Sequence, residues 1–167
     1  MNLIAAADRN WGIGRDGELL KRISRDMKFF SSKTTGQVIV MGRKTLESFP
    51  GGKPLPNRIN IVMTGNPAYD GRGAVVVHDL KELKTALAAY EDKEVYVSGG
   101  GGIYKLLLPY CDTAYITRID EEYPADTWMP NLDEAANWKI TEAGEPLEEK
   151  GTSFRFLTYK NDRPEAL

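Results

Sequence analysis

The 167-residue sequence contains one cysteine and one histidine, and this scarcity excludes several kinds of chemistry. Cys111 has no partner for an internal disulfide, so a reducing cytoplasm is the expected setting. With no histidine near it in the sequence, Cys111 is expected to fill the core rather than act as a nucleophile. His78 stands alone, and no C-x-x-C, H-E-x-x-H, aspartate-rich loop or G-x-S-x-G elbow occurs. We therefore expect neither a metal site nor a serine hydrolase.

Long apolar runs and an excess of basic charge are also missing. The first apolar run, "LIAAA", stops at Asp8, and no window approaches the roughly 20 apolar residues of a membrane span. No signal peptide and no membrane partner are therefore expected. The net charge of −2 argues against nucleic acid as the main partner, which would favour a strongly basic face.

Short β-branched or apolar segments recur along the chain and alternate with helical patterns. The strands are expected over 3–7, 38–41, 59–63, 74–77, 95–98, 114–119, 138–143 and 153–159. The helices are expected over 24–33, 43–49, 80–90 and 102–109, with Ser24 and Asp79 as candidate N-caps. This alternation predicts a single α/β domain over 1–167, with a mostly parallel sheet of about eight strands and flanking helices. Its last two strands should form an antiparallel hairpin.

Four consecutive glycines, Gly99 to Gly102, separate the strand "VYVS" from a helical run. Each glycine costs roughly 0.5–1 kcal/mol in conformational entropy, so the run needs an explanation. A strand, a glycine turn and a helix N-terminus together form an anion site, and the alternative is a tight connection without a ligand. The spacing is not the G-x-G-x-x-G of a standard dinucleotide site.

Two further small-residue turns follow strands and strengthen the phosphate interpretation. "VIVMGRKTLESF" passes through Gly42 into a helix that begins with Arg43, Lys44 and Thr45, and "MTGNP" follows the next strand. The alternative is that Arg43 and Lys44 are exposed to solvent and bind no ligand. Because ligands bind at the carboxyl edge of open α/β sheets, the three turns together predict a phosphorylated nucleotide.

Asp26 is the candidate for acid–base chemistry. It lies beside Met27 and one turn before Phe30, so it either shares their apolar face or simply favours the positive end of the helix dipole. In an apolar pocket its pKa would rise, and the carboxylate could hold a cationic or amidine-like group.

Six segments, in order and spacing over nearly the whole chain, resemble dihydrofolate reductase of the bacterial chromosomal type. They are "LIAAADRNWGIGRDGELL", "RDMKFF", "VIVMGRKTLESF", "PLPNRINIVMT", "VYVSGGGGIY" and "YITRIDEEYPADTWMP". The resemblance implies reduction of 7,8-dihydrofolate to tetrahydrofolate by NADPH, in support of one-carbon metabolism. It also implies a cytoplasmic monomer, inhibition by antifolates, and an adenosine-binding subdomain over roughly 38–105.

The same resemblance assigns roles to individual residues. Asp26, linked to Thr117, would assist protonation of the pterin through water, and Arg58 would pair with the carboxylate of the substrate's glutamate tail. The other substrate contacts would be Ile4, Ala5, Ala6, Leu19, Met27, Phe30, Phe49 and Leu55. The cofactor contacts would be Ala6, Ile13, Gly14, Gly17, Leu19, Gly42, Arg43, Lys44, Thr45, Met63, Thr64, His78, Ser98, Gly99, Gly100, Gly101, Gly102, Ile103, Tyr104 and Thr127. Residues 12–20 would form a mobile loop over the nicotinamide.

Three positions depart from the family pattern. Lys21 stands where the family usually has tryptophan, Ser24 replaces a proline, and Ser98 replaces an isoleucine. The first leaves the details of proton delivery open. Two rival functions are a related reductase acting on a ribosylated pyrimidine in riboflavin synthesis and a nucleotide-binding module without catalysis. Arg58 favours folate over the former, and Asp26 on an apolar face argues against the latter.

Overall fold

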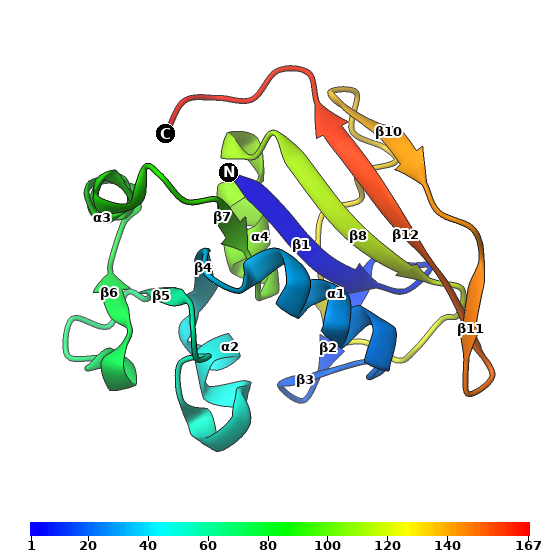
Figure 1. Ribbon diagram of the computed structural model, residues 1–167, viewed down its shortest axis with the longest axis horizontal. Coiled ribbons are helices and arrows are strands. Elements are labelled where there is room, and N and C mark those ends of the chain that lie inside the picture. The colour runs from blue at the N-terminus through cyan, green and yellow to red at the C-terminus, as the bar shows by residue number, and fades with distance from the viewer.

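The computed structural model describes residues 1–167 and is built on one large, mostly parallel sheet (Figure 1). Its strands follow the order β10-β12-β8-β1-β7-β4-β5-β6, with β11 beside β12. The parallel part comprises β1 (Asn2–Ala7), β4 (Val38–Gly42), β5 (Ile59–Met63), β6 (Val75–Val77), β7 (Val95–Val97) and β8 (Thr113–Ile119). The antiparallel part comprises β10 (Trp138–Ala143), β11 (Leu147–Glu149) and β12 (Thr152–Asn161).

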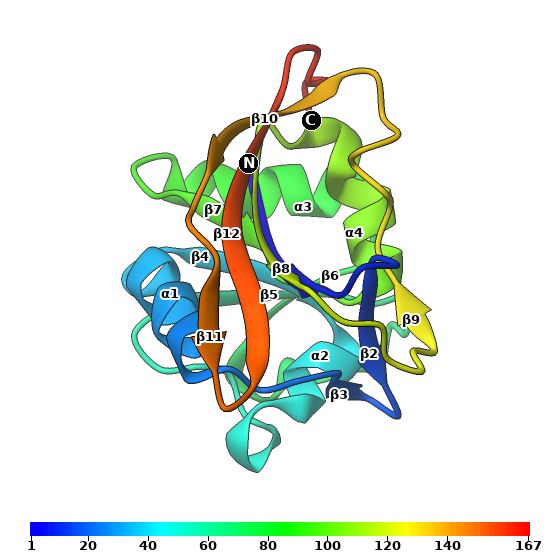
Figure 2. The same ribbon diagram turned by 90° about the vertical axis from the view of Figure 1, so that its right-hand side faces the viewer.

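Helices cover both faces of this sheet, as the two views show (Figures 1 and 2). On one face, α1 (Ser24–Thr34) and α2 (Arg43–Ser48) contribute Phe29, Phe30 and Leu46 to a core with Ile39 and Met41. On the other, Leu83 of α3 (Leu80–Leu87) and Leu107 of α4 (Gly101–Leu107) pack into the larger core. Strands buried on both sides read as continuous apolar runs, which is why β4 and β5 could be predicted.

All eight expected strands are present, and the sheet order confirms the α/β class. The two long C-terminal strands are antiparallel neighbours, and β11 lies in the connection between them. The prediction missed a three-stranded sheet made of β2 (Gly12–Arg15), β3 (Glu18–Leu19) and β9 (Thr127–Trp128). Short 3-10 turns follow α2, α3 and α4 and precede β6, over Pro50–Gly52, Ala88–Tyr90, Leu108–Tyr110 and Gly71–Gly73.

The N-terminus of α1 corrects one expectation. Ser24 is the first residue of the helix and not its cap, and the residue at the cap position, Ile23, offers no side-chain hydrogen bond. Glu149 from β11 takes this role: its carboxylate accepts from the backbone N–H of Ser24 at 2.6 Å and of Arg25 at 3.3 Å. The predicted cap of α3 is confirmed, because Asp79 accepts from the N–H of Glu82 at 2.8 Å.

Two exclusions drawn from the sequence can be compared with the structure. Cys111 is fully buried and donates a weak hydrogen bond from Sγ to the Leu107 carbonyl, as expected of a core residue. None of the helices combines the length and the apolar character needed to cross a membrane.

Candidate active site

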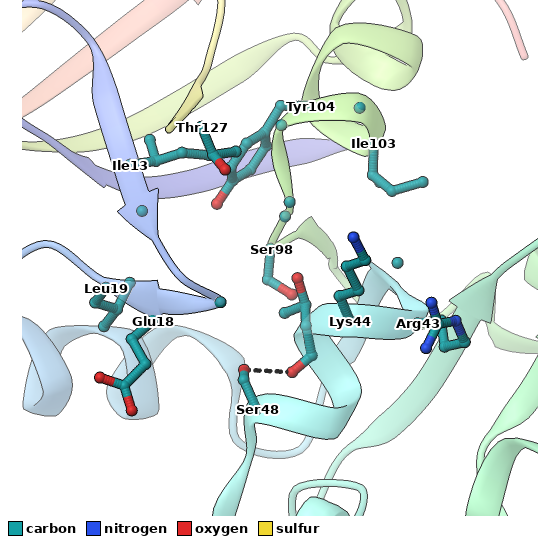
Figure 3. A pocket seen from close by; sticks show the side chains of 18 of the residues that line it. Ile13, Glu18, Leu19, Arg43, Lys44, Ser48, Ser98, Ile103, Tyr104 and Thr127 are labelled. Carbon is teal, nitrogen blue, oxygen red and sulfur yellow. Dashed lines mark hydrogen bonds between the residues drawn. The ribbon is translucent and has the colours of Figure 1, made fainter. Parts of the chain in front are cut away.

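A cavity of about 870 Å³ opens at the carboxyl ends of β4, β5 and β7. Figure 3 shows it between the β2–β3 segment, the N-terminus of α2 and the N-terminus of α4. Every residue that the resemblance assigned to the cofactor lines it except His78. Parallel strands end at one edge of a sheet, so small-residue turns that are far apart in the sequence converge there.

The glycine run forms one wall of this cavity. Gly99 has φ +111°, a conformation that favours glycine, and its carbonyl accepts from the N–H of Gly42 at 2.8 Å. A Cβ on Gly101 would lie 2.6 Å from the carbonyl oxygen of Trp128, so the protein itself requires glycine there. A Cβ on Gly102 would meet nothing within 4 Å. Because these residues lack side chains, the turn after β7 can lie backbone to backbone with the turn after β4.

The start of α2, which lies next to the glycine run, brings two cations to the cavity. Lys44 extends into the cavity and makes no ion pair (Figure 3). Arg43 Nη1 contacts both carboxylate oxygens of Glu47, at 2.7 and 3.1 Å, so part of its guanidinium already has a partner. A cation at a helix N-terminus is disfavoured by the helix dipole, whereas an anionic ligand would favour it.

His78 lies behind the turn that carries Thr64 rather than in the cavity. Its Nδ1 lies 2.7 Å from the Thr64 carbonyl oxygen, and the backbone N–H of His78 donates to a carboxylate oxygen of Glu82 at 3.1 Å. The side chain therefore supports the Thr64 turn from outside, and Thr64 itself lines the cavity.

Five residues that line the cavity were not singled out individually from the sequence: Arg15, Asp16, Glu18, Ser48 and Asp126. Three of them fall in the 12–20 loop that had been assigned as a whole. Asp126 is distant in sequence but directly precedes β9, which pairs with β2, and its Oδ2 accepts from the N–H of Asp16 at 2.9 Å. This backbone hydrogen bond is the main cause of the lowered pKa of Asp126. The short "ADT" segment is the one sequence signal for Asp126, and the resemblance selected only Thr127 from it.

Asp26 is turned toward the sheet, as one of the two sequence interpretations required. Its Oδ1 accepts a hydrogen bond from Thr117 Oγ1 of β8 at 2.7 Å. Burial raises the pKa of Asp26, and the Thr117 hydrogen bond opposes part of that rise. Tyr104, from α4, lies within electrostatic reach, and its hydroxyl donates to the Ile4 carbonyl at 2.7 Å. Burial holds the Tyr104 pKa far above neutrality, so this phenol stays protonated.

An apolar cluster lies next to this part of α1, because Phe30 follows Asp26 by one helical turn. Ile4 belongs to the same core cluster as Phe30, Phe49 and Leu55, all four of which were expected to contact substrate. Ala5 is buried in the neighbouring core, and Ala6 and Leu19 line the large cavity. Met27 is 39% exposed, whereas Phe29, which the pattern did not single out, packs against Phe156 with ring centroids 4.8 Å apart.

Arg58 lies at the outer end of α1. Its Nη1 donates to Thr34 Oγ1 at 3.1 Å and its Nε to the Pro56 carbonyl at 3.0 Å. The guanidinium carbon also lies 5.9 Å from the centre of the Phe30 ring. Partial burial lowers the pKa of Arg58, which nevertheless stays charged because guanidinium pKa values are so high. These contacts hold one edge of the guanidinium and leave Nη2 without a protein partner.

Two of the positions that depart from the family pattern, Lys21 and Ser98, make few hydrogen bonds within the protein. Lys21 is half-buried and forms no hydrogen bond or ion pair. Ser98 lines the cavity, and its hydroxyl makes one long bond, of 3.4 Å, to the Val40 carbonyl.

The sheet, the cavity at its carboxyl edge and the half-buried carboxylate of Asp26 on the neighbouring helix define an α/β enzyme with a nucleotide-sized site. The chain belongs to the dihydrofolate reductase family, because the family model described as "Dihydrofolate reductase" matches residues 1–161. It is 39% identical to the dihydrofolate reductase of Bacillus subtilis over 162 residues, 96% of this chain and 94% of that one. It is 36% identical to the dihydrofolate reductase of Neisseria meningitidis, with 95% and 96% coverage.

A solved structure agrees with this membership. The dihydrofolate reductase of Enterococcus faecalis, complexed with NADP(H) and RAB-propyl, superposes with a TM-score of 0.83 at 35% identity. The match covers 96% of this chain and 95% of that one. Neither rival function raised by the sequence is supported by these relatives, which carry the name dihydrofolate reductase.

Proposed function

We propose that this protein reduces 7,8-dihydrofolate to tetrahydrofolate with NADPH as the hydride donor. The observation that carries the proposal is the junction of two sites. A cavity of about 870 Å³, lined by the glycine run and the cations of α2, reaches Ala6 of β1, and Ala6 pairs with Thr117 of β8, which holds Asp26. Family membership and the NADP(H) complex of the Enterococcus relative support the assignment.

The residues of the large cavity fit a phosphorylated dinucleotide. Its volume lies within the roughly 300–1,000 Å³ of small-molecule sites. Lys44 has no carboxylate partner, Thr45 and Thr64 supply hydroxyls, and the open side of Gly102 leaves room against the backbone. Arg43 and Thr64 would hold the 2′-phosphate, and residues 38–105 would form the adenosine-binding part of the domain. Bound NADPH supplies the hydride.

The pterin of the substrate would lie against the apolar cluster that contains Ile4, Phe30, Phe49 and Leu55. Asp26, held by Thr117, would be the carboxylate beside it. An ionised Asp26 can accept hydrogen bonds from the amidine-like edge of the ring, and a protonated one can relay a proton through water. Its raised pKa brings the two forms closer in energy at working pH, which acid–base catalysis requires.

Arg58 is suited to the tail of the substrate. A guanidinium can bind a carboxylate with two parallel hydrogen bonds, and the contacts to Thr34 and Pro56 orient this one in advance. The proposal further includes a monomeric, cytoplasmic enzyme that supplies one-carbon metabolism and binds antifolates, as the resemblance implies.

The decisive experiment mixes protein, NADPH and dihydrofolate and follows loss of the near-ultraviolet absorbance of the reduced nicotinamide. We expect turnover that requires both reactants and stops on addition of an antifolate. A phosphoribosylated aminopyrimidine serves as the control substrate and should leave the absorbance unchanged. Binding of NADPH without turnover of dihydrofolate would contradict the proposal and leave only a nucleotide site.

A further inference from the structure

The buried carboxylate of Asp8 has no part in the site described above, yet it joins two segments that wall the cavity. Asp8 directly follows β1 and is fully buried. Its Oδ1 accepts from the backbone N–H of Asn10 at 2.9 Å and of Gly12 at 2.8 Å. Its Oδ2 accepts from the N–H of Tyr123 at 3.0 Å. One side chain therefore holds both the turn that leads into β2 and the segment that leads to Asp126 and Thr127.

The turn between Asp8 and Gly12 has a shape that needs this support. Trp11 adopts φ +62°, a left-handed conformation that is unfavourable for a residue with a side chain. The N–H of Trp11 donates to the Asp8 carbonyl at 3.1 Å, and the N–H of Asp8 donates to the Gly12 carbonyl at 3.0 Å. The two Oδ1 hydrogen bonds complete this turn and so determine the direction in which Gly12 starts β2.

The packing around the carboxylate leaves little room for movement. A Cβ on Gly12 would lie 2.8 Å from the Ala125 Cβ and 3.1 Å from Asp8 Oδ1. The turn and the 123–125 segment are thus in direct contact at the point where Asp8 ties them. Residues 12–19, which we call the lid, run from this contact along one wall of the cavity.

The other end of the lid is held differently. The N–H of Asp16 donates to Asp126 Oδ2 at 2.9 Å, and this bond is exposed to solvent. Water can replace an exposed hydrogen bond at small net cost, whereas a fully buried carboxylate that loses its donors pays the full desolvation penalty. The exposed end of the lid is therefore free to open while the buried end is not.

We propose that Asp8 is a positioning residue for cofactor binding: it fixes the base of the lid against the 123–125 segment, so that the lid opens only at its Asp16–Asp126 end. The inference rests on the proposed function for the identity of the cofactor. Asp8 itself touches neither cofactor nor substrate.

Amide hydrogen exchange on the unmodified protein tests the base of the lid directly. In the free protein, the amide of Asp16 should exchange fast, whereas those of Gly12 and Tyr123 should be strongly protected. Added NADPH should slow Asp16 and leave Gly12 and Tyr123 as they were. If all three amides exchange equally fast in the free protein, the lid opens from its base and the proposal is wrong. If NADPH slows no amide of the cavity, the proposed function fails, and the free-protein comparison still decides the role of Asp8.

The variant Asp8→Asn tests the consequence for catalysis. Asparagine keeps one oxygen for Asn10 and Gly12 but turns an N–H₂ group toward the N–H of Tyr123. It therefore removes the side-chain tie between the two segments and leaves their backbone hydrogen bonds, such as that from Arg9 to Glu121, in place. We expect the KM for NADPH to rise about tenfold, the order of effect of one lost charge-assisted hydrogen bond. The KM for dihydrofolate should stay unchanged. A lower melting temperature with an unchanged KM for NADPH would make Asp8 merely structural.

Two further variants complete the test. Asp120→Asn is the matched control, because Asp120 ties the same turn to the same segment through an exposed ion pair with Arg9 at 2.8 Å. It should change neither KM. Gly12→Ala disturbs the junction from the other side and replaces Asp8→Asn if that variant does not fold. It should also raise the KM for NADPH alone, and a normal value would overturn the proposal.

Discussion

Replacing Asp26 by asparagine removes the carboxylate that is bound to Thr117 and keeps the size of the side chain. Asparagine Oδ1 can still accept from Thr117 Oγ1, which now lies 2.7 Å from the carboxylate, so the packing of α1 on β8 should survive. No neighbour can take over the proton. Tyr104 is within electrostatic reach, but its pKa is raised far above neutrality and its hydroxyl is committed to the Ile4 carbonyl. We expect reduction of dihydrofolate at neutral pH to fall by about 10²–10⁴-fold, the contribution of a positioned acid–base group.

The pH dependence of this loss identifies its cause. At lower pH, solvent can protonate the substrate directly, so the deficit of Asp26→Asn should shrink. The substitution should lower activity at neutral pH without lowering the stability of the folded protein. Burial raises the folded-state pKa of Asp26 above 3.8, so the ionised group opposes folding. This cost is absent below the unfolded pKa. It grows between the unfolded and the folded pKa, by about 1.4 kcal/mol for each pH unit that separates them, and stays constant above the folded pKa. Asp26→Asn should therefore melt no lower than the wild type at neutral pH.

The assay is turnover of both proteins across a pH series, read from the absorbance of the reduced nicotinamide, with melting temperature and NADPH binding measured alongside. NADPH binding is the internal control and should not change, because Asp26 does not line the large cavity. A folded Asp26→Asn protein with normal turnover at neutral pH would refute the acid–base role. Normal turnover together with a lower melting temperature would identify Asp26 as a helix-start residue and nothing more.

Three other substitutions test separate parts of the site and the fold. Arg43→Gln should lower the preference for NADPH over NADH by roughly 10–150-fold, the range of one charge-assisted contact, and an unchanged ratio of kcat/KM values would remove Arg43 from the phosphate site. Arg58→Leu should raise the KM for dihydrofolate by about one decade or more with NADPH affinity intact, because it removes a bidentate carboxylate partner; an unchanged KM would place the tail elsewhere. Glu149→Gln should lower the melting temperature at neutral pH. The Ser24 N–H holds the pKa of Glu149 below its usual value, so its stabilisation is present above the unfolded pKa and lost as the pH falls through the folded one. The variant and the wild type should therefore converge in acid, and a constant difference would contradict the capping role.

The parts of the fold that could be predicted are those in which local sequence and burial agree. β4 and β5 read as unbroken apolar runs because both faces of the sheet are covered, and Asp79 lies at the start of the stripe that forms α3. The small sheet could not be predicted in this way. β3 and β9 have two residues each, and β9 pairs with β2 from more than a hundred residues away, so neither carries a periodic signal.

Capping of α1 escaped prediction for the same reason. Ser24 has the side chain of a good cap, but the helix already includes it, and Glu149 reaches the free N–H groups from β11. Asp8 is a comparable case, since its third hydrogen bond goes to Tyr123. From the sequence alone, a polar residue that accepts a hydrogen bond from a distant backbone N–H cannot be distinguished from one that binds water.

The glycine run shows how much of the candidate site can be predicted from the presence of glycine alone. Four glycines predict either a turn or a close approach, and two of the four meet one of these needs in the structure. Gly99 requires glycine for its positive φ, and Gly101 for the carbonyl of Trp128, which is part of the protein itself. Only Gly102 leaves open space, where a Cβ would meet nothing and where a bound nucleotide would be the first contact. Alanine at Gly101 would therefore disturb β9 before any ligand is present, whereas the cost of alanine at Gly102 would appear only on binding.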